Sequence, residues 1–276
     1  MASLSSSLNF TPSALKSKSL GSRSFRISIS PENGTTFLSK SKISFKLPSM
    51  SRSYFDLQSA SVRGKIRMVN AADTAVDFLD TNIYSVIDRL EITTSNNVLD
   101  NIPNFNVLLS AMRSMSSSIN NVNGVSHDLL LGGGDLANPN LSQPIGVAGD
   151  GIRDFVMPLP SIGLLSLDKL LPADAVECPT IHFHLADHRT AILQGNTANT
   201  TDYELTDLEL FMNVVELSAE SQALLDSSVA DTGYVFDYQG IEGTTFTKTN
   251  TTRSLTQTLG TRVSSLEKML VTIRDS

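Results

Sequence analysis

The sequence is poor in cysteine, in charged residues and in long apolar runs. Among its 276 residues there is one cysteine, Cys178, which excludes an intramolecular disulfide framework. Its setting, Val-Glu-Cys-Pro, offers no base that could activate a thiol, so we predict a buried, inert side chain. No apolar run approaches the roughly 20 residues that a membrane-spanning helix needs, so the sequence predicts no membrane span.

Charge is scarce as well. Charged residues make up 18% of the chain, below the roughly 25% usual for soluble domains, and Ser, Thr and Asn take their place. This composition favours strands and turns over charged helices. The net charge of −7 means that the chain as a whole does not attract nucleic acid, and any contact with a genome must be local. Apolar residues, at 40%, suffice for a sizeable core.

The N-terminal segment lacks acidic residues. Between Met1 and Pro31 there is no Asp or Glu, while serines are frequent. We interpret residues 1–23 as a disordered, weakly basic arm, because strand-like alternation begins by Phe25 without a break typical of a processing site. An organelle transit peptide has a similar composition. That alternative would make the chain a plastid-targeted β-sandwich binding protein.

Apolar and polar residues alternate with a period of two, which predicts an all-β protein. In the clearest stretch, residues 60–69, alternate positions are apolar on one side and basic on the other, with Arg63, Lys65 and Arg67 outside. Irregular spacing and long polar loops favour a sandwich or jelly roll over an up-and-down barrel. Further strands are predicted over residues 25–29, 43–47, 84–92, 154–157, 180–185, 208–217, 234–237, 246–249 and 266–273.

Two short helices interrupt this pattern. Asp100 or Asn101 can cap a helix that has Pro103 in its first turn. The apolar residues that follow fall at i, i+3, i+4 and i+7 and form one stripe: Phe105, Leu108, Leu109 and Met112. Ser218 can cap a second helix that runs through Leu225.

One histidine cluster has the spacing of a metal site. His182 and His184 share one face of a predicted strand, Phe183 and Leu185 share the other, and His188 follows. A cupin-like metalloenzyme would use such a strand, but its second motif needs a downstream histidine. The remaining histidine, His127, lies upstream. We therefore predict a role at a strand edge or subunit contact, with a metal site as the alternative.

No other constellation predicts catalysis, and we predict no catalytic, cofactor-binding or metal-binding residue. The acidic residues Asp207 and Glu209 are interpreted as a solvated strand face. The basic stripe of Arg63, Lys65 and Arg67 is the best candidate for a weak contact with nucleic acid, although a solvated face is the simpler interpretation. No aromatic residues interleave it, so base stacking is not expected.

Several short phrases occur in a characteristic order along the chain. They are Phe-Arg-Ile-Ser-Ile-Ser-Pro-Glu-Asn and Lys-Ile-Ser-Phe-Lys-Leu-Pro within residues 24–47, Tyr-Phe-Asp-Leu at 54–57, the segments 87–92 and 98–106, the apolar stretch 155–171, and the long strand 203–217. In this order they resemble the major capsid proteins of the double jelly-roll lineage of DNA viruses, which includes adenovirus hexon, virophages and Polinton-like elements.

This resemblance implies a fold and a role. It implies one complete jelly roll over residues 24–260, with short helices in its loops, and a junction into, or first strand of, a second roll over residues 261–276. Members of the family are generally longer. The implied role is that of a virion subunit without catalysis or cofactors. Its partners would be copies of itself in trimers of pseudo-hexagonal outline and in a shell, together with minor capsid proteins.

Overall fold

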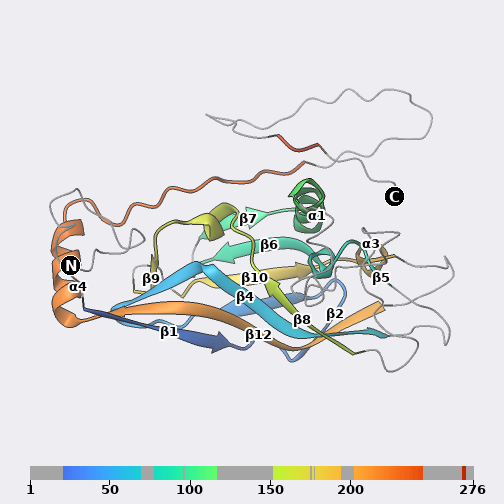
Figure 1. The fold of residues 1–276 in the computed structure, drawn as a ribbon, viewed down its shortest axis with the longest axis horizontal. Helices are drawn as coiled ribbons and strands as arrows, with labels where there is room; N and C mark the ends of the chain where they lie inside the picture. Colours follow the sequence, from blue (N-terminus) through green and yellow to red (C-terminus); the bar gives the residue numbers. More distant parts are fainter. Residues whose placement is uncertain are drawn as a thin grey trace.

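A computed structural model describes residues 21–69, 78–95, 97–116, 152–174, 176, 178–193, 202–244 and 269–271. The chain forms two antiparallel sheets that pack face to face (Figure 1). Within this part of the chain no helix is long and apolar enough to cross a membrane.

The first sheet is built around two long strands, β4 (Ser53–Val69) and β12 (Asp202–Leu217). Its order is β1-β12-β4-β8, where β1 is Ser22–Ile29 and β8 is Arg153–Pro158. Two short strands extend it, because β2 (Thr36–Leu38) pairs with β12 and β9 (Leu171–Pro172) pairs with β4. Both long strands are therefore paired on both sides.

The second sheet has the order β3-β10-β6-β7. Its strands are β3 (Lys42–Lys46), β10 (Thr180–Leu185), β6 (Ile87–Thr93) and β7 (Val98–Ile102). The two main paths together contain eight strands, which can be numbered one to eight along the chain. The first sheet then has the order first-eighth-third-sixth, and the second sheet has the order second-seventh-fourth-fifth. This is the topology of a jelly roll, and the predicted all-β jelly-roll sandwich is confirmed.

Short elements join the strands. A third, two-stranded ladder pairs β5 (Phe78–Leu79) with β11 (Ile192–Leu193). The helical turns are η3 (Ile83–Val86), η5 (Gly163–Ser166) and α3 (His188–Ala191), and the longer helices are α1 (Phe105–Ser116) and α4 (Ala219–Val229).

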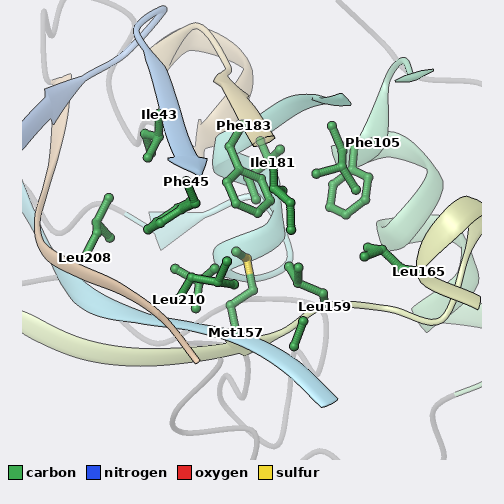
Figure 2. Close-up of a cluster of buried hydrophobic side chains, with 14 of the residues drawn as sticks. Ile43, Phe45, Phe105, Met157, Leu159, Leu165, Ile181, Phe183, Leu208 and Leu210 are labelled. Carbon is green, nitrogen blue, oxygen red and sulfur yellow. The ribbon is translucent and has the colours of Figure 1, made fainter. Parts of the chain in front are cut away.

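The core lies between the two sheets, where apolar side chains from both inner faces meet (Figure 2). Phe45 of β3 and Phe183 of β10 pack edge to face with their ring centroids 5.9 Å apart. Such aromatic pairs stabilise a core beyond the area that they bury. Opposite them, Leu210 of β12 and Met157 of β8 close the layer.

A bulge in β12 explains the glycine in the centre of β4. The pairing register shifts between Thr206 and Glu209, and Asp207 takes a left-handed conformation with φ of 52°. The bulge brings the side chain of Leu208 over Gly64, where a Cβ atom would collide with Leu208 and lie 3.0 Å from the Phe155 ring. Glycine is therefore required here by close packing.

A predicted helix cap and a predicted strand start differ from the structure. Asp100 and Asn101 do not cap α1, because both lie in β7 and the helix begins at Phe105. Asp100 instead accepts a hydrogen bond of 2.7 Å from the backbone N–H of Leu164 in η5. The strand predicted from residue 84 begins at Ile87, because Asn82 caps the η3 turn in front of it.

The segment 230–244, named the strap, was predicted to contain a strand at residues 234–237 and contains none. It runs extended along the outside of β7 towards α1 (Figure 1). Side chains hold it: Tyr238 Oη donates to the Leu99 carbonyl at 2.6 Å, and Tyr234 stacks on Phe236. Alternating aromatic residues produced a strand-like pattern, but the strap contacts β7 through a side chain and forms no backbone ladder with it.

Other predictions hold. β4, β8, β10 and β12 include the predicted strands 60–69, 154–157, 180–185 and 208–217, and Ser218 caps α4 through the N–H of Ser221. β1 begins at Ser22, so the predicted arm over residues 1–23 ends two residues too late. Residues 1–20, the predicted strand 246–249 and most of the predicted junction 261–276 lie outside the described residues. Of the predicted strand 266–273, residues 269–271 are described, and they form no strand.

Candidate functional site: the outer faces of the two sheets

The outer face of the first sheet carries the basic stripe of β4. Arg63, Lys65 and Arg67 point outward, as their alternation predicted. The adjacent strand β12 supplies acidic partners. Arg67 donates to Glu204 at 2.5 Å, and Lys65 lies 2.8 Å from the Asp207 carboxylate.

The third basic residue follows the same pattern, because Arg63 is the register partner of Glu209. The predicted solvated face at Asp207 and Glu209 is thus part of a row of opposite charges across two strands. Opposite charges facing each other stabilise strand pairing. A stripe neutralised in this way has little positive potential left for phosphates, so a contact with nucleic acid stays a prediction without structural support.

The two ion pairs differ in burial. The Glu204 side chain is 9% exposed, whereas that of Asp207 is 67% exposed. A carboxylate as buried as Glu204 needs its cation, because the charge has lost its water. The hydrogen bond and charge of Asp207 raise the pKa of Lys65, but this pair stands in solvent.

The outer face of the second sheet carries the two strand histidines. His182 and His184 lie on the outer side of β10, and Phe183 and Leu185 are buried in the core, as predicted. The predicted strand edge is wrong, because β10 pairs with β3 on one side and with β6 on the other. The histidines therefore lie in the middle of a sheet face.

Each histidine is held by its neighbours across the strands. Nδ1 of His182 lies 2.9 Å from the Ser44 hydroxyl, and its Nε2 lies 3.0 Å from the Thr93 hydroxyl. Nε2 of His184 lies 3.1 Å from the carboxylate of Glu91. Both rings are thus part of a hydrogen-bonded network over β3, β10 and β6.

Burial and charge shift two pKa values in this network. Burial, together with the positive charge of Lys42, holds the pKa of His182 below its ordinary value. Burial acts to raise the pKa of Glu91. The hydrogen bond from His184 and the charges of Arg89 and Lys42 outweigh it, so that pKa lies below its usual range. This sheet face therefore favours a neutral His182 beside a charged Glu91.

The metal alternative lacks its ligand set in the described residues. His188 lies in α3, where its Nδ1 is 3.1 Å from the Asp187 carboxylate. Across the part of the chain that the structure describes, no three His, Cys, Asp or Glu side chains gather as a metal site would require. His127 lies outside this part.

Cys178 lies outside the buried core, and the interior between the sheets is apolar. Cys178 is half-buried rather than buried as predicted, because it lies in the turn before β10 with φ of 44°. Between the sheets there is a small cavity, and its lining is apolar throughout, from Ile43 and Phe45 to Leu205 and Leu208. A cavity without polar groups cannot orient a polar substrate.

Because the two ion pairs differ in burial, removing the cation of each should change the free energy of unfolding by different amounts. We expect Arg67→Ala to lower the free energy of unfolding by about 1–3 kcal/mol, because it leaves a buried carboxylate unpaired. The control Lys65→Ala leaves the free energy of unfolding unchanged within error, since Asp207 stays hydrated. Urea denaturation measures both, and Glu204→Gln added to Arg67→Ala recovers part of the loss. Equal losses in the two single variants would contradict the assignment.

The lowered pKa of His182 gives a dependence of stability on pH. The unfolded chain binds a proton at this histidine more readily than the folded chain, so stability is lost as the pH falls below the unfolded pKa of about 6.5. Gln keeps a donor and an acceptor for Ser44 and Thr93 but does not titrate. We expect His182→Gln to lose less stability than the wild-type protein between about pH 7.5 and 5.5, measured by urea denaturation. Parallel pH profiles of the two proteins would refute this.

Comparison with known proteins finds a likeness in structure and none in sequence. No protein-family model matches the chain, and no curated protein matches it. The Faustovirus major capsid protein aligns with a TM-score of 0.49 and 8% identity over 80% of this chain and 58% of its own. The Sputnik virophage structure aligns with a TM-score of 0.48 and 12% identity over 73% of this chain and 49% of its own. The major capsid protein of Sulfolobus turreted icosahedral virus aligns with a TM-score of 0.47 and 9% identity over 77% of this chain and 54% of its own.

The chain spans about half the length of the proteins in these structures. The chain is thus similar in structure to double jelly-roll major capsid proteins.

Proposed function

We propose that this chain is a structural subunit of a viral capsid, that it acts without catalysis, and that it assembles with copies of itself into trimers and a shell. The observation that carries the proposal is the strand order of the sandwich, which is that of a jelly roll from β1 to β12. The ordered phrases in the sequence that resemble double jelly-roll capsid proteins fall on these same strands. Viral capsid domains are among the proteins built on this architecture.

The surfaces of the sandwich fit such a role. A capsid subunit must keep its fold while its loops and faces meet neighbours, so its charges are best compensated within the subunit. On the first sheet, the pairs Arg67–Glu204 and Lys65–Asp207 do this, and on the second, the Lys42 ammonium lies 4.0 Å from the Glu91 carboxylate. Long connections between strands can then vary at subunit contacts without disturbing the core.

The same proposal assigns a role to each part of the chain: an N-terminal arm, one jelly roll and a junction into a second roll. The described strands from Ser22 to Leu217 make one roll. We propose that residues 261–276 lead into a second roll and that the residues before β1 form a basic arm. Two similar rolls in each subunit would give a trimer a six-sided outline, and closed rotational symmetry of this kind tiles a shell. The proposed location is the virion, with minor capsid proteins as further partners.

The mass and shape of the purified 276-residue chain test this proposal. In analytical ultracentrifugation over a concentration series, we expect a species of three times the chain mass of 29.8 kDa. Negative-stain electron microscopy of the same fractions is expected to show threefold-symmetric particles or shells. A folded protein that stays monomeric at the highest concentration reached would overturn the proposal.

A further inference from the structure

The main strand path of each sheet ends in two edge strands: β1 and β8 in the first sheet, where the short strands β2 and β9 lie at the same two edges, and β3 and β7 in the second. An edge strand presents unpaired N–H and C=O groups to which another strand can add, unless the protein covers them. The four edges of this protein are covered to different degrees. This difference points to the place where a neighbouring copy binds.

Both edges of the second sheet are covered. On β3, the amide side chain of Asn33 donates to the Lys42 carbonyl at 2.5 Å and accepts from the Ser44 N–H at 3.0 Å, while the Glu32 N–H donates to the Ser44 carbonyl at 2.9 Å. On β7, Tyr238 of the strap donates to the Leu99 carbonyl. These contacts occupy backbone groups that another strand would need.

The edge of β1 has no such cover among the described residues, where its backbone pairs with β12 alone. The strand is eight residues long and contains neither proline nor glycine, and its register with β12 runs from Ser22 to Ile29 without a shift. Its inner side chains, including Phe25 and Ile27, are only half-buried although they pack against the core. A long, regular strand with a half-buried apolar face is suited to accept another strand.

The outer face of β1 also lacks a negative charge. Arg26 stacks over the Phe211 ring at 5.0 Å and donates to the Ser61 hydroxyl at 3.1 Å. Among the described residues it has no carboxylate partner, and β1 itself contains no acidic residue. A strand that adds here and carries a carboxylate opposite Arg26 would gain an ion pair.

The opposite edge of the same sheet supplies such a strand. In the described structure β8 pairs with β4 alone, and the hydroxyl of Tyr84 covers only its end, at the Pro158 carbonyl. Asp154 is exposed on β8 and forms no ion pair in the described residues, since Lys65 beside it binds Asp207. The two edges of this sheet are therefore complementary in charge.

We propose that β1 of one copy adds to β8 of a second copy, so that the first sheet continues from one subunit into the next. Successive antiparallel pairings make β1 and β8 run in opposite directions, so the added strand keeps the antiparallel order. The register that sets Arg26 opposite the partner's Asp154 also sets Phe25 opposite the partner's Phe155. Inner faces then meet inner faces, as a shared core requires.

This contact specifies the surfaces through which the copies would assemble, and it rests on the proposed self-assembly. Because β1 and β8 are different surfaces, the contact is head-to-tail, and it closes into a ring or continues as an open array according to the rotation between subunits. Pairing β1 with β1 of another copy would be symmetric. It would bring Arg26 against Ser24 or a second Arg26 and would supply no carboxylate.

Intermolecular disulfides test the register. In a Cys178→Ala background, Arg26→Cys and Asp154→Cys proteins are purified separately, mixed and oxidised. Residues directly opposite on antiparallel strands have Cβ atoms about 4.5–5.5 Å apart, close enough for a disulfide after a small shift. We expect about tenfold more cross-linked dimer in the mixture than in either protein alone. Ser28→Cys mixed with Asp154→Cys is the matched control, displaced to a diagonal position about 7–8 Å away.

Charge reversal separates this contact from self-assembly in general. We expect Arg26→Glu and Asp154→Arg each to weaken self-association about tenfold in analytical ultracentrifugation, and the double variant to restore it. Thermal unfolding checks that each variant is folded. Cross-linking through Arg26→Cys alone, or self-association that neither reversal weakens, would overturn the β1–β8 contact while leaving the capsid proposal standing. A wild-type protein that does not self-associate would overturn both.

Discussion

The pairing of β4 with β12 is the interaction on which the rest of the structure depends. These two strands of 17 and 16 residues pair along most of their length, and they lie in the middle of the first sheet. Their inner side chains, such as Ile66 and Leu210, form one wall of the core. Their outer side chains set basic residues against acidic ones. One pairing therefore fixes both the packing of the sandwich and the charge balance of its surface.

The same pairing explains why the strands accept so few changes of register. A shift by one residue would move the apolar set of β12 to the solvent face and bring Glu204 and Glu209 towards the core. The bulge at Asp207 fixes the alignment further, because Leu208 must find Gly64 opposite it. A regular strand without the bulge would leave one of these contacts unmade. The apolar pattern and the ion pairs thus specify the same register, which is a sign of a well-defined fold.

Local patterns in the sequence predicted what depends on neighbours along the chain. Alternation placed His182 and His184 on one face of β10, and a serine before a helical stretch identified the start of α4. Errors arose where tertiary contacts decide. Asp100 has the chemistry of a helix cap, but it binds the N–H of Leu164, a residue far away in sequence. The strap alternates like a strand and runs beside the edge strand β7, yet it contacts β7 through a side chain, the Tyr238 hydroxyl, and not through a backbone ladder.

The ion pairs of the outer face were missed for a similar reason, because the sequence does not state which strands are neighbours. A signal was nevertheless present: a run of alternating basic residues on one strand and acidic residues of similar spacing on another. The position of β10 between two strands depends on the strand order of the jelly roll, which no single segment encodes. The resemblance to capsid proteins indicated a jelly roll, which the fold confirms, but the position of β10 inside its sheet was not predicted from it.

Hydrogen–deuterium exchange of the 276-residue chain tests the central pairing most directly. Amides in the centre of a sheet exchange only when the domain unfolds, whereas segments held by side chains open locally. We expect peptides from β12, residues 202–217, to exchange at the rate of global unfolding, and peptides from the strap, residues 230–244, to exchange much faster. Exchange of β12 as fast as that of the strap would contradict the paired position of β12 between β1 and β4.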